Sequence, residues 1–516
     1  MHWADVIARD LMSTGDKHLI SAGISPTGFI HVGSLREAVT AETVRKALAD
    51  QGADVRMIYL IDSYDPLRRR YDFLPEGYED EVGKPISHVP CPYGCHDTYA
   101  DHFIKPFMES MDEIGVNCEL FWTHELYERG MFTETIDATF RRRNKVLEIL
   151  NGVTGREMPD GFYPFSPLCK RCGRLNGTHI TAYEYPYVHY VCDCGESGKA
   201  DIRKGEGKLS WRLEWPAKWK IFGVTCEPFG KDHAAAGGSY DSGVRLVREV
   251  FDAEPPYPIP YEFIQLKGKG QMHKSTGSSV SGIDALKMMP STVFTYTIIR
   301  VNPERHIDYD SGLGILDMVD EYDRVERLYY EGGATEKEED LLRAYELSQP
   351  NGPRPTMSIQ IPYRHLVNVV QISRDFDDIL TILRRTTDFQ GVDIDDLKTL
   401  EKRVECVRYW LNAFAPESVK FKISETLPDV EISPEESVFL KELLQVLEGC
   451  EWTGDAVHNA VYETAKASSL GAKKAFQTLY LIFIERRSGP RLGHFLATLE
   501  RDFVLRRIAE AAEKAA

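Results

Sequence analysis

The stretch "ISPTGFIHVGSLRE", residues 24–37, decides the fold, because it joins an apolar run to a helical segment through a glycine-rich turn. The preceding run "KHLISAG" (17–23) is predicted to be a buried strand, and "DVRMIYLID" (54–62) a second one. Residues 34–51 between them contain no glycine or proline and predict a helix. Such a crossover predicts parallel strands and places the loop at the carboxyl edge of a sheet, where doubly wound proteins bind nucleotides.

The loop itself has features of a phosphate site. Ser34 and Glu37 have the spacing of a capping box, so we expect the helix to begin there with its free amides facing the loop. This end of a helix stabilises an anion. Gly28 and Gly33 would let a ligand approach the backbone closely, and His31 could donate a hydrogen bond to a phosphate. A plain turn fits the stretch equally well, so the loop alone leaves both interpretations open.

Two further loops resemble the first in composition. "EPFGKDHAAAGGSYDSG" (227–243) places Asp232 and His233 in a turn after a predicted strand. "KGKGQMHKSTGSSVSG" (267–282) contains three lysines and follows the predicted strand "YEFIQL" (261–266). The lysines would neutralise phosphates, although a linker can have the same composition. If all three loops follow strands of one parallel sheet, they meet at the same edge.

The overall composition limits the kinds of partner. A formal net charge of -18 over 516 residues excludes a broad electrostatic grip on nucleic acid, so any such contact must use local basic patches. No apolar run of membrane-spanning length and no signal-like start is present, and we expect a cytoplasmic protein without a membrane partner. Ten cysteines without an export signal do not indicate a disulfide framework.

Four of the cysteines form two close pairs. "CKRCG" (169–173) and "CDCGE" (192–196) are separated by a segment long enough for a hairpin. Four thiolates at this spacing predict a tetrahedral structural zinc site, the alternative being four unconnected thiols. The predicted ligands are Cys169, Cys172, Cys192 and Cys194.

A second group of metal-ligand residues lies in "CPYGCHDTYADH" (91–102). A turn can bring the adjacent Cys and His to one metal, and a further His follows one or two helical turns later. The spacing alone leaves open whether a metal binds. The candidate ligands are Cys91, Cys95, His96 and His102.

Helical patterns dominate beyond about residue 300. In "SPEESVFLKELLQVLEG" (433–449), Ser433 and Glu436 form a predicted capping box, Pro434 occupies the first helical position and Gly449 ends the helix. We therefore expect an all-helical C-terminal domain.

These motifs resemble those of a known enzyme family. "PTGFIHVGS" (26–34) is similar to the HIGH motif of class I aminoacyl-tRNA synthetases, and "QMHKS" (271–275) is similar to a degenerate KMSKS motif. The match is closer to class I lysyl-tRNA synthetases of the archaeal type and covers essentially the whole chain. It extends through "YDPLR", "IRKGEGKLSWR", "GKDHAAAGGSYD" and "SGPRLGHFLATLERDFV".

The resemblance implies an α/β protein with three parts. Residues 1–290 would form a Rossmann-type catalytic domain with a parallel sheet and a zinc-bearing insertion at about 88–205. Residues 291–370 would form a connecting region that contacts the tRNA stem, and residues 371–516 would form an all-α anticodon-binding domain. In this family the segment 91–102 also supplies metal ligands, so two zinc sites are expected.

The resemblance also implies a reaction and its residues. L-lysine would be activated by ATP, with Mg²⁺, and transferred to tRNA(Lys). His31 and Lys274 would be catalytic. The lysine pocket would use Gly23, Ser25, Trp211, His233 and Tyr261. The ATP-binding residues would be Pro26, Thr27, Gly28, His31, Gly33, Ser34, Asp232, His233, Met272, Lys274 and Ser275.

The second motif departs from the family pattern. Gln271 and His273 stand where the family has Lys and Ser. This keeps open a degenerate paralogue that binds tRNA or regulates without efficient aminoacylation. A small-cofactor adenylyltransferase would share the phosphate loop but would not need the long helical C-terminal half. Lysine-dependent exchange of pyrophosphate into ATP would separate these alternatives.

Overall fold

The computed structural model describes residues 1–514 except 156, 160, 268–269, 272–279, 388 and 390–391. It divides into two compact units. The first comprises Met1–Leu286, Ser291–Asp310 and Val325–Pro353, and the second Lys287–Pro290, Ser311–Arg324 and Arg354–Ala516. None of the helices in the described ranges combines the length and the apolar composition that crossing a membrane requires.

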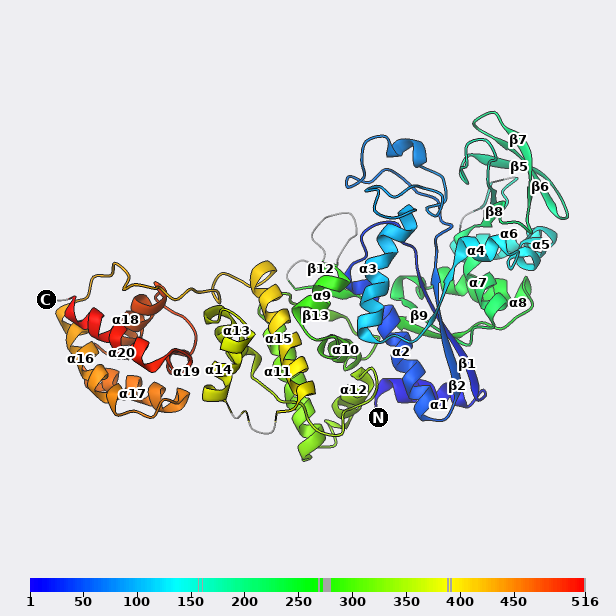
Figure 1. Cartoon of the computed structure of the whole chain (residues 1–516). Helices are drawn as coiled ribbons and strands as arrows, with labels where there is room; N and C mark the ends of the chain where they lie inside the picture. Colours follow the sequence, from blue (N-terminus) through cyan, green and yellow to red (C-terminus); the bar gives the residue numbers. More distant parts are fainter. Residues whose placement is uncertain are drawn as a thin grey trace. The chain divides into compact units, whose positions relative to one another are not determined.

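A five-stranded parallel sheet forms the centre of the first unit (Figure 1). Its strand order is β10-β9-β1-β2-β3. Strands β1 and β2 are parallel neighbours, and their pairing runs from Lys17 opposite Asp54 to Ile24 opposite Ile61. This confirms the predicted strand–helix–strand unit. The strands are β1 Lys17–Ile24, β2 Asp54–Ile61, β3 Glu119–Trp122, β9 Cys226–Gly230 and β10 Tyr257–Tyr261.

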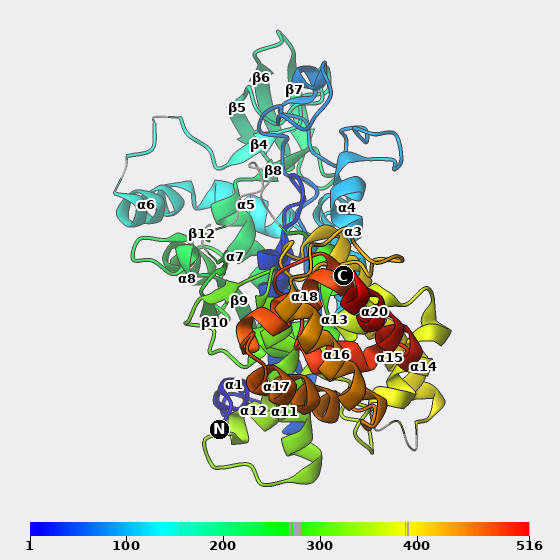
Figure 2. The ribbon, with the colours of Figure 1, turned by 90° about the vertical axis from the view of Figure 1, so that its left-hand side faces the viewer.

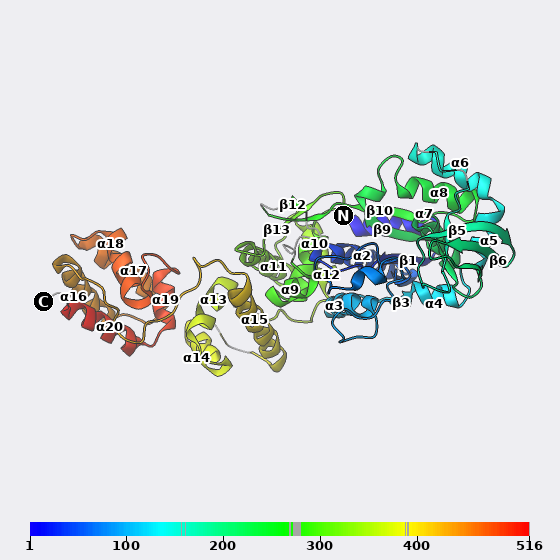
Figure 3. The same cartoon turned by 90° about the horizontal axis from the view of Figure 1, so that it is seen from above.

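Helices cover both faces of this sheet, as Figure 3 shows for α3 and α8. Side chains alternate along β2, so Ile58 and Leu60 join the same apolar core as Trp219 of α7 and Leu246 of α8. The opposite face carries α2 and α3. The helices from the N-terminal part of the chain are α1 Trp3–Met12, α2 Leu35–Asp50, α3 Tyr99–Ile114, α4 Thr123–Glu128, α5 Thr133–Arg141, α6 Arg143–Thr154, α7 Trp211–Phe222, α8 Ser239–Glu249, α9 Gly282–Met288, α10 Ser291–Ile299 and α12 Glu339–Ser348.

The region predicted as an insertion is divided by elements of the main layers, because α3 and β3 lie within it. The part after β3 contains a three-stranded antiparallel sheet, β5-β6-β7, and the strand pair β4-β8 (Figure 2). These strands are β4 Phe165–Pro167, β5 Thr178–Glu184, β6 Tyr187–Cys192, β7 Ser197–Asp201 and β8 Gly207–Leu209.

The third glycine-rich loop does not follow a strand of the main sheet. Its preceding strand is β11 Ile264–Leu266, which pairs with β12 Gly270–Gln271 and β13 Ile307–Tyr309 in a separate sheet. The expectation of three successive strands in one sheet is therefore wrong. The chain after this loop nevertheless returns to the first loop, where Val32 N donates to Val280 O at 2.9 Å.

The second unit is helical. The capping box predicted at Ser433 and Glu436 is confirmed, with bonds of 3.3 and 2.8 Å in the two directions. Apolar side chains of α16 to α20, including Phe439, Leu479 and Phe495, form its largest core. The helices are α11 Gly314–Glu331, shared with the first unit, α13 Tyr363–Ile372, α14 Phe376–Thr386, α15 Ile394–Ala413, α16 Pro434–Glu448, α17 Gly454–Ala467, α18 Ala472–Ile484, α19 Leu492–Thr498 and α20 Arg501–Glu513.

A cluster of five charged side chains is buried beside the carboxyl edge of the sheet. Its members are Asp62, Asp65, Lys208, Glu214 and Lys218. Lys208 Nζ lies 3.2 Å from Asp65 Oδ1 and also contacts Glu214. Lys218 Nζ lies 3.0 Å from Glu214 Oε1 and contacts Asp62. No more than 12% of any of these side chains is exposed, so each ammonium depends on its carboxylates in place of water.

The cluster joins segments that are distant in sequence. Ser25 Oγ, in the loop after β1, donates to Asp65 Oδ2 at 2.9 Å. Tyr127 of α4 donates to Glu214 Oε2 at 3.0 Å. The first glycine-rich loop is thereby connected to β8 and α7.

We predict that Lys208→Met destabilises the first unit by about 3–5 kcal/mol, because it leaves buried carboxylates without their cation. Urea unfolding followed by tryptophan fluorescence measures this change. The matched control is Lys204→Met, an exposed lysine of the same region, which should cost less than about 0.5 kcal/mol. Equal stability of the two variants would contradict the prediction.

Candidate functional site

Predicted ligand-binding residues gather at the carboxyl edge of three neighbouring strands. Gly23 lies near the end of β1, and Ser25 follows it. Asp232 and His233 form the turn directly after β9, and Tyr261 ends β10. Because these strands are adjacent and parallel, their carboxyl ends meet at one edge.

The Glu37 carboxylate connects two of these strands. Its Oε1 accepts a hydrogen bond from Gly23 N at 2.9 Å, and its Oε2 accepts one from Tyr261 Oη at 2.7 Å. The predicted capping box is wrong, since Ser34 makes no side-chain cap bond. The chain instead enters α2 through a 3-10 turn at Val32–Ser34, and the first-turn glutamate reaches back to the sheet edge.

The Glu37 carboxyl group is surrounded by hydrogen-bond donors and, in the part of the chain that the structure describes, lacks a cationic neighbour. Burial raises its pKa to about 7, although the bonds from Gly23 and Tyr261 oppose that rise. Within the described residues, no lysine or arginine forms an ion pair with it. A ligand with an ammonium group would supply the missing charge and favour the ionised carboxylate.

Trp211 and His233 form a second wall of predicted pocket residues. Trp211 is the first residue of α7, and its ring centroid lies 5.1 Å from that of His233. The Trp215 ring lies 5.6 Å from His233. Burial lowers the pKa of His233, so its imidazole is neutral near pH 7.

The first glycine-rich loop is held from several sides. Thr27 O accepts a hydrogen bond from Tyr99 Oη at 2.9 Å. Gly28 leaves room for Phe73, whose ring would come within 3.1 Å of an added Cβ. His31 forms a bridge with Ser281, beyond the lysine-rich loop.

The rest of the predicted nucleotide site is only partly described. Pro26 precedes these held residues in the loop, and Gly33 and Ser34 lie in the 3-10 turn that leads into α2. The amides at this turn and helix start suit an anion. Met272, His273, Lys274 and Ser275 lie outside the described residues, so the role of Lys274 stays a prediction.

Both groups of predicted metal ligands are assembled. The ligand atoms of each group lie within 4.8 Å of one another. Sγ–Sγ distances are 3.6 Å between Cys169 and Cys194 and 3.8 Å between Cys172 and Cys192. Thiolates 2.3 Å from a tetrahedral zinc ion lie about 3.8 Å apart, so the spacing fits.

The second group has the same dimensions. Cys95 Sγ lies 3.8 Å from Cys91 Sγ and 3.2 Å from Nδ1 of both His96 and His102. Two thiols and two imidazoles form a typical structural zinc site, and all positions are filled by protein. Both clusters could therefore hold a metal.

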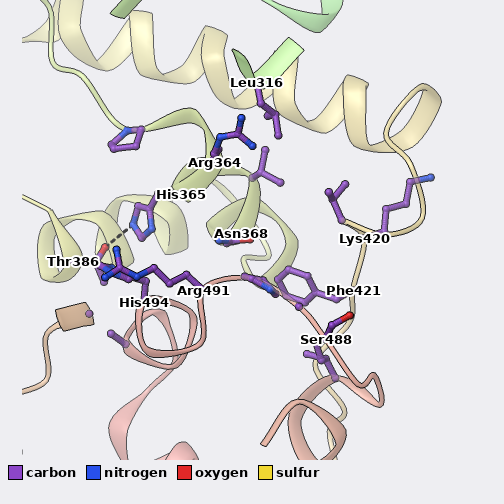
Figure 4. A pocket seen from close by; sticks show the side chains of 18 of the residues that line it. Leu316, Arg364, His365, Asn368, Thr386, Lys420, Phe421, Ser488, Arg491 and His494 are labelled. Carbon is purple, nitrogen blue, oxygen red and sulfur yellow. Dashed lines mark hydrogen bonds between the residues drawn. The ribbon is translucent and has the colours of Figure 1, made fainter. Parts of the chain in front are cut away.

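The helical unit contains a cavity of about 590 Å³ that the sequence did not predict. Figure 4 shows His365, Arg491 and His494 on one side and Lys420 and Phe421 on the other. No aspartate or glutamate is among the described residues that line it. Burial lowers the pKa of His365 to about 4, so this side chain is neutral, and its Nε2 lies 3.0 Å from Thr386 Oγ1.

Comparison with known proteins identifies the family. The family described as "tRNA synthetases class I (K)" matches residues 1–351, and "Anticodon binding domain" matches residues 396–512. A lysine–tRNA ligase of Archaeoglobus fulgidus is 43% identical over 514 residues, with 99% of this chain and 100% of the relative covered. A lysine–tRNA ligase of Thermoplasma acidophilum is 42% identical over 508 residues, with 98% of each covered.

Among solved structures, a glutamate tRNA ligase from Elizabethkingia meningosepticum covers 97% of this chain and 100% of its own at 14% identity and a TM-score of 0.42. A structural similarity with this TM-score carries no argument. The relatives found by sequence, in contrast, match nearly the whole length of this chain. From those matches, the chain belongs to the class I lysyl-tRNA synthetase family.

Proposed function

We propose that the chain is a lysine–tRNA ligase, which activates L-lysine with ATP and transfers it to the 3′ end of tRNA(Lys). The full-length match to lysine–tRNA ligases carries this proposal. Glu37 at the sheet edge supports the proposal, because it has no cationic partner among the described residues. The side-chain ammonium group of lysine needs an acidic partner of this kind.

In the proposed lysine pocket, Glu37 and Tyr261 bind the ε-ammonium group. Glu37 supplies the negative charge, and the Tyr261 hydroxyl holds that carboxylate in place. Gly23 and Ser25 lie at the end of β1 for contact with the amino-acid backbone, and Trp211 and His233 line the alkyl chain. Selectivity for lysine would follow from the charge at Glu37, since an apolar analogue would leave a buried carboxylate unpaired.

The proposed reaction needs no covalent nucleophile. The lysine carboxylate attacks the α-phosphate of ATP, and pyrophosphate leaves. The helix start after Ser34 and the His31 side chain would stabilise the phosphates, and Lys274 is proposed to neutralise charge on the leaving pyrophosphate. Mg²⁺ is proposed to accompany the nucleotide phosphates and to neutralise their charge. The protein's contribution is the positioning of the two substrates.

Lysine-dependent exchange of labelled pyrophosphate into ATP tests this function. We expect exchange with lysine, ATP, Mg²⁺ and tRNA(Lys) present, and none when lysine is replaced by another amino acid. Absence of exchange under all these conditions would favour the degenerate paralogue and overturn the proposal. Exchange with a different amino acid would overturn the lysine assignment alone.

For Glu37→Gln, we predict a KM for lysine about 10- to 100-fold higher, because a charged hydrogen bond to the ammonium is lost. The affinity for norleucine, which lacks the ε-amino group, should not fall. The comparison of the two ligands in both proteins isolates the contact between Glu37 and the ammonium. An equal loss for both ligands would contradict the assignment.

The same carboxyl group predicts a pH dependence. The pKa of Glu37 is about 7, so its negative charge, and with it lysine binding, is lost as the pH falls through 7. We expect kcat/KM for lysine to decrease below pH 7 in the wild type and not in Glu37→Gln. His233 has a lowered pKa and should protonate only at a more acidic pH.

We also propose that both ligand clusters bind structural zinc. Metal analysis of the pure protein should give about two zinc ions per chain. Cys169→Ser should remove about one and lower the melting temperature. The control is Cys450→Ser, a half-buried cysteine outside both clusters. A zinc-free protein whose melting temperature is unchanged by chelators would refute this proposal.

The cavity of the helical unit is proposed to receive an unpaired anticodon base. Asn368 offers amide donor and acceptor atoms, Phe421 offers a ring for stacking, and Lys420, Arg486 and Arg491 offer positive charge. No acid is among the described lining residues, although Glu417 pairs with Lys420 and Asp455 with Arg491 beside the cavity. Arg486 is therefore the cation proposed to meet the phosphate backbone most directly.

Arg491→Gln is expected to raise the KM for tRNA several-fold and to reduce its salt dependence, because one cationic contact is lost. The KM for lysine should not change. Arg374→Gln is the matched control, an exposed arginine of the same unit outside the cavity. If both variants behave alike in aminoacylation kinetics, the cavity does not bind tRNA.

A further inference from the structure

A second buried acid lies behind the proposed lysine pocket. Glu227 is on β9, between β1 and β10, and only 6% of it is exposed. Its Oε1 accepts a hydrogen bond from Trp215 Nε1 at 2.9 Å, and its Oε2 accepts one from Trp219 Nε1. No ion pair to Glu227 occurs among the residues that the structure describes. The Glu227 side chain thus accepts hydrogen bonds from two indole N–H groups.

The two indoles connect Glu227 to the pocket wall. Trp215 stacks on Trp211 with a centroid distance of 5.2 Å and also contacts His233 at 5.6 Å. Trp219 packs against Gly243, where an added Cβ would lie only 2.7 Å from the ring. The indole of Trp219 therefore has no free space on that side, and Trp215 cannot turn without displacing Trp211 or His233.

Two acceptor oxygens are needed at this position. An indole N–H group is only a donor, so two indoles that converge on one side chain require two acceptors. A carboxyl group has two oxygens that can accept, and its ionised form has no proton on either, whereas a glutamine amide provides one acceptor and a donor NH₂ that would oppose the second indole. Burial raises the pKa of Glu227 to about 8, and both indole donors oppose that rise because they stabilise the ionised form.

We infer that Glu227 is a positioning residue for amino-acid binding: it fixes Trp215 and Trp219 so that Trp211 and His233 line the lysine pocket. This inference rests on the proposed lysine pocket. It differs from a purely structural role, in which Glu227 would affect the amount of folded enzyme and not its affinity for lysine.

The experiment compares Glu227→Gln, Glu227→Asp and Trp211→Ala with the wild type in lysine-dependent pyrophosphate exchange. KM values for lysine and ATP are measured separately, and active-site titration gives the folded fraction. For Glu227→Gln we expect the KM for lysine to rise about tenfold or more, with an unchanged KM for ATP and a shifted tryptophan emission. Glu227→Asp keeps two acceptors and should recover part of the affinity.

The control is Tyr240→Phe. Tyr240 packs on Trp219 and donates to Pro256 O at 2.8 Å, but it makes no hydrogen bond to Glu227. This variant disturbs the same aromatic cluster and should leave the KM for lysine unchanged.

The outcomes separate the inference from the pocket on which it rests. If Trp211→Ala leaves the KM for lysine unchanged, the pocket assignment fails. If Trp211→Ala raises it and Glu227→Gln lowers only kcat and the folded fraction, Glu227 is structural and the inference alone is overturned. If Glu227→Gln does not fold, Glu227→Asp decides, because its shorter side chain displaces both acceptor oxygens. The inference then requires a higher ratio of the KM for lysine to the KM for ATP than in the wild type, and a wild-type ratio overturns it.

Discussion

The pairing of buried charges beside the carboxyl edge of the sheet is the constraint on which the site depends. Asp62 and Asp65 follow β2, Lys208 lies on β8, and Glu214 and Lys218 are one turn apart on α7. Removing one member would leave another charged and buried, which costs more than the pair contributes. The strand ends, β8 and α7 must therefore assemble together.

This constraint explains how one helix serves two purposes. Glu214 and Lys218 of α7 face the charged cluster, while Trp211 at its start and Trp215 one turn later face His233. The ion pairs of Glu214 and Lys218 thus help to set the position of the proposed pocket wall. On the other face of the sheet, Glu37 of α2 connects β1 to β10.

Acids without a cationic partner surround the proposed pocket. Glu37 forms no ion pair among the described residues, and the buried cluster has three acidic side chains for two lysines. A cationic amino acid would compensate this charge more effectively than a neutral one. The contacts around Glu37 are therefore consistent with the proposed cationic substrate.

Local patterns were sufficient for part of this protein. Apolar runs predicted β1 and β2, cysteine spacing predicted the grouping of the metal ligands, and short-range chemistry predicted the capping box at Ser433. The sequence alone determined these features. The partner of Glu37 could not be found in that way. Its spacing from Ser34 is that of a cap, but a bond to Tyr261 depends on which strands become neighbours. The same holds for Glu227, and for β11, which joins another sheet. Only tertiary structure decided these features, because it sets which distant side chains share a buried space.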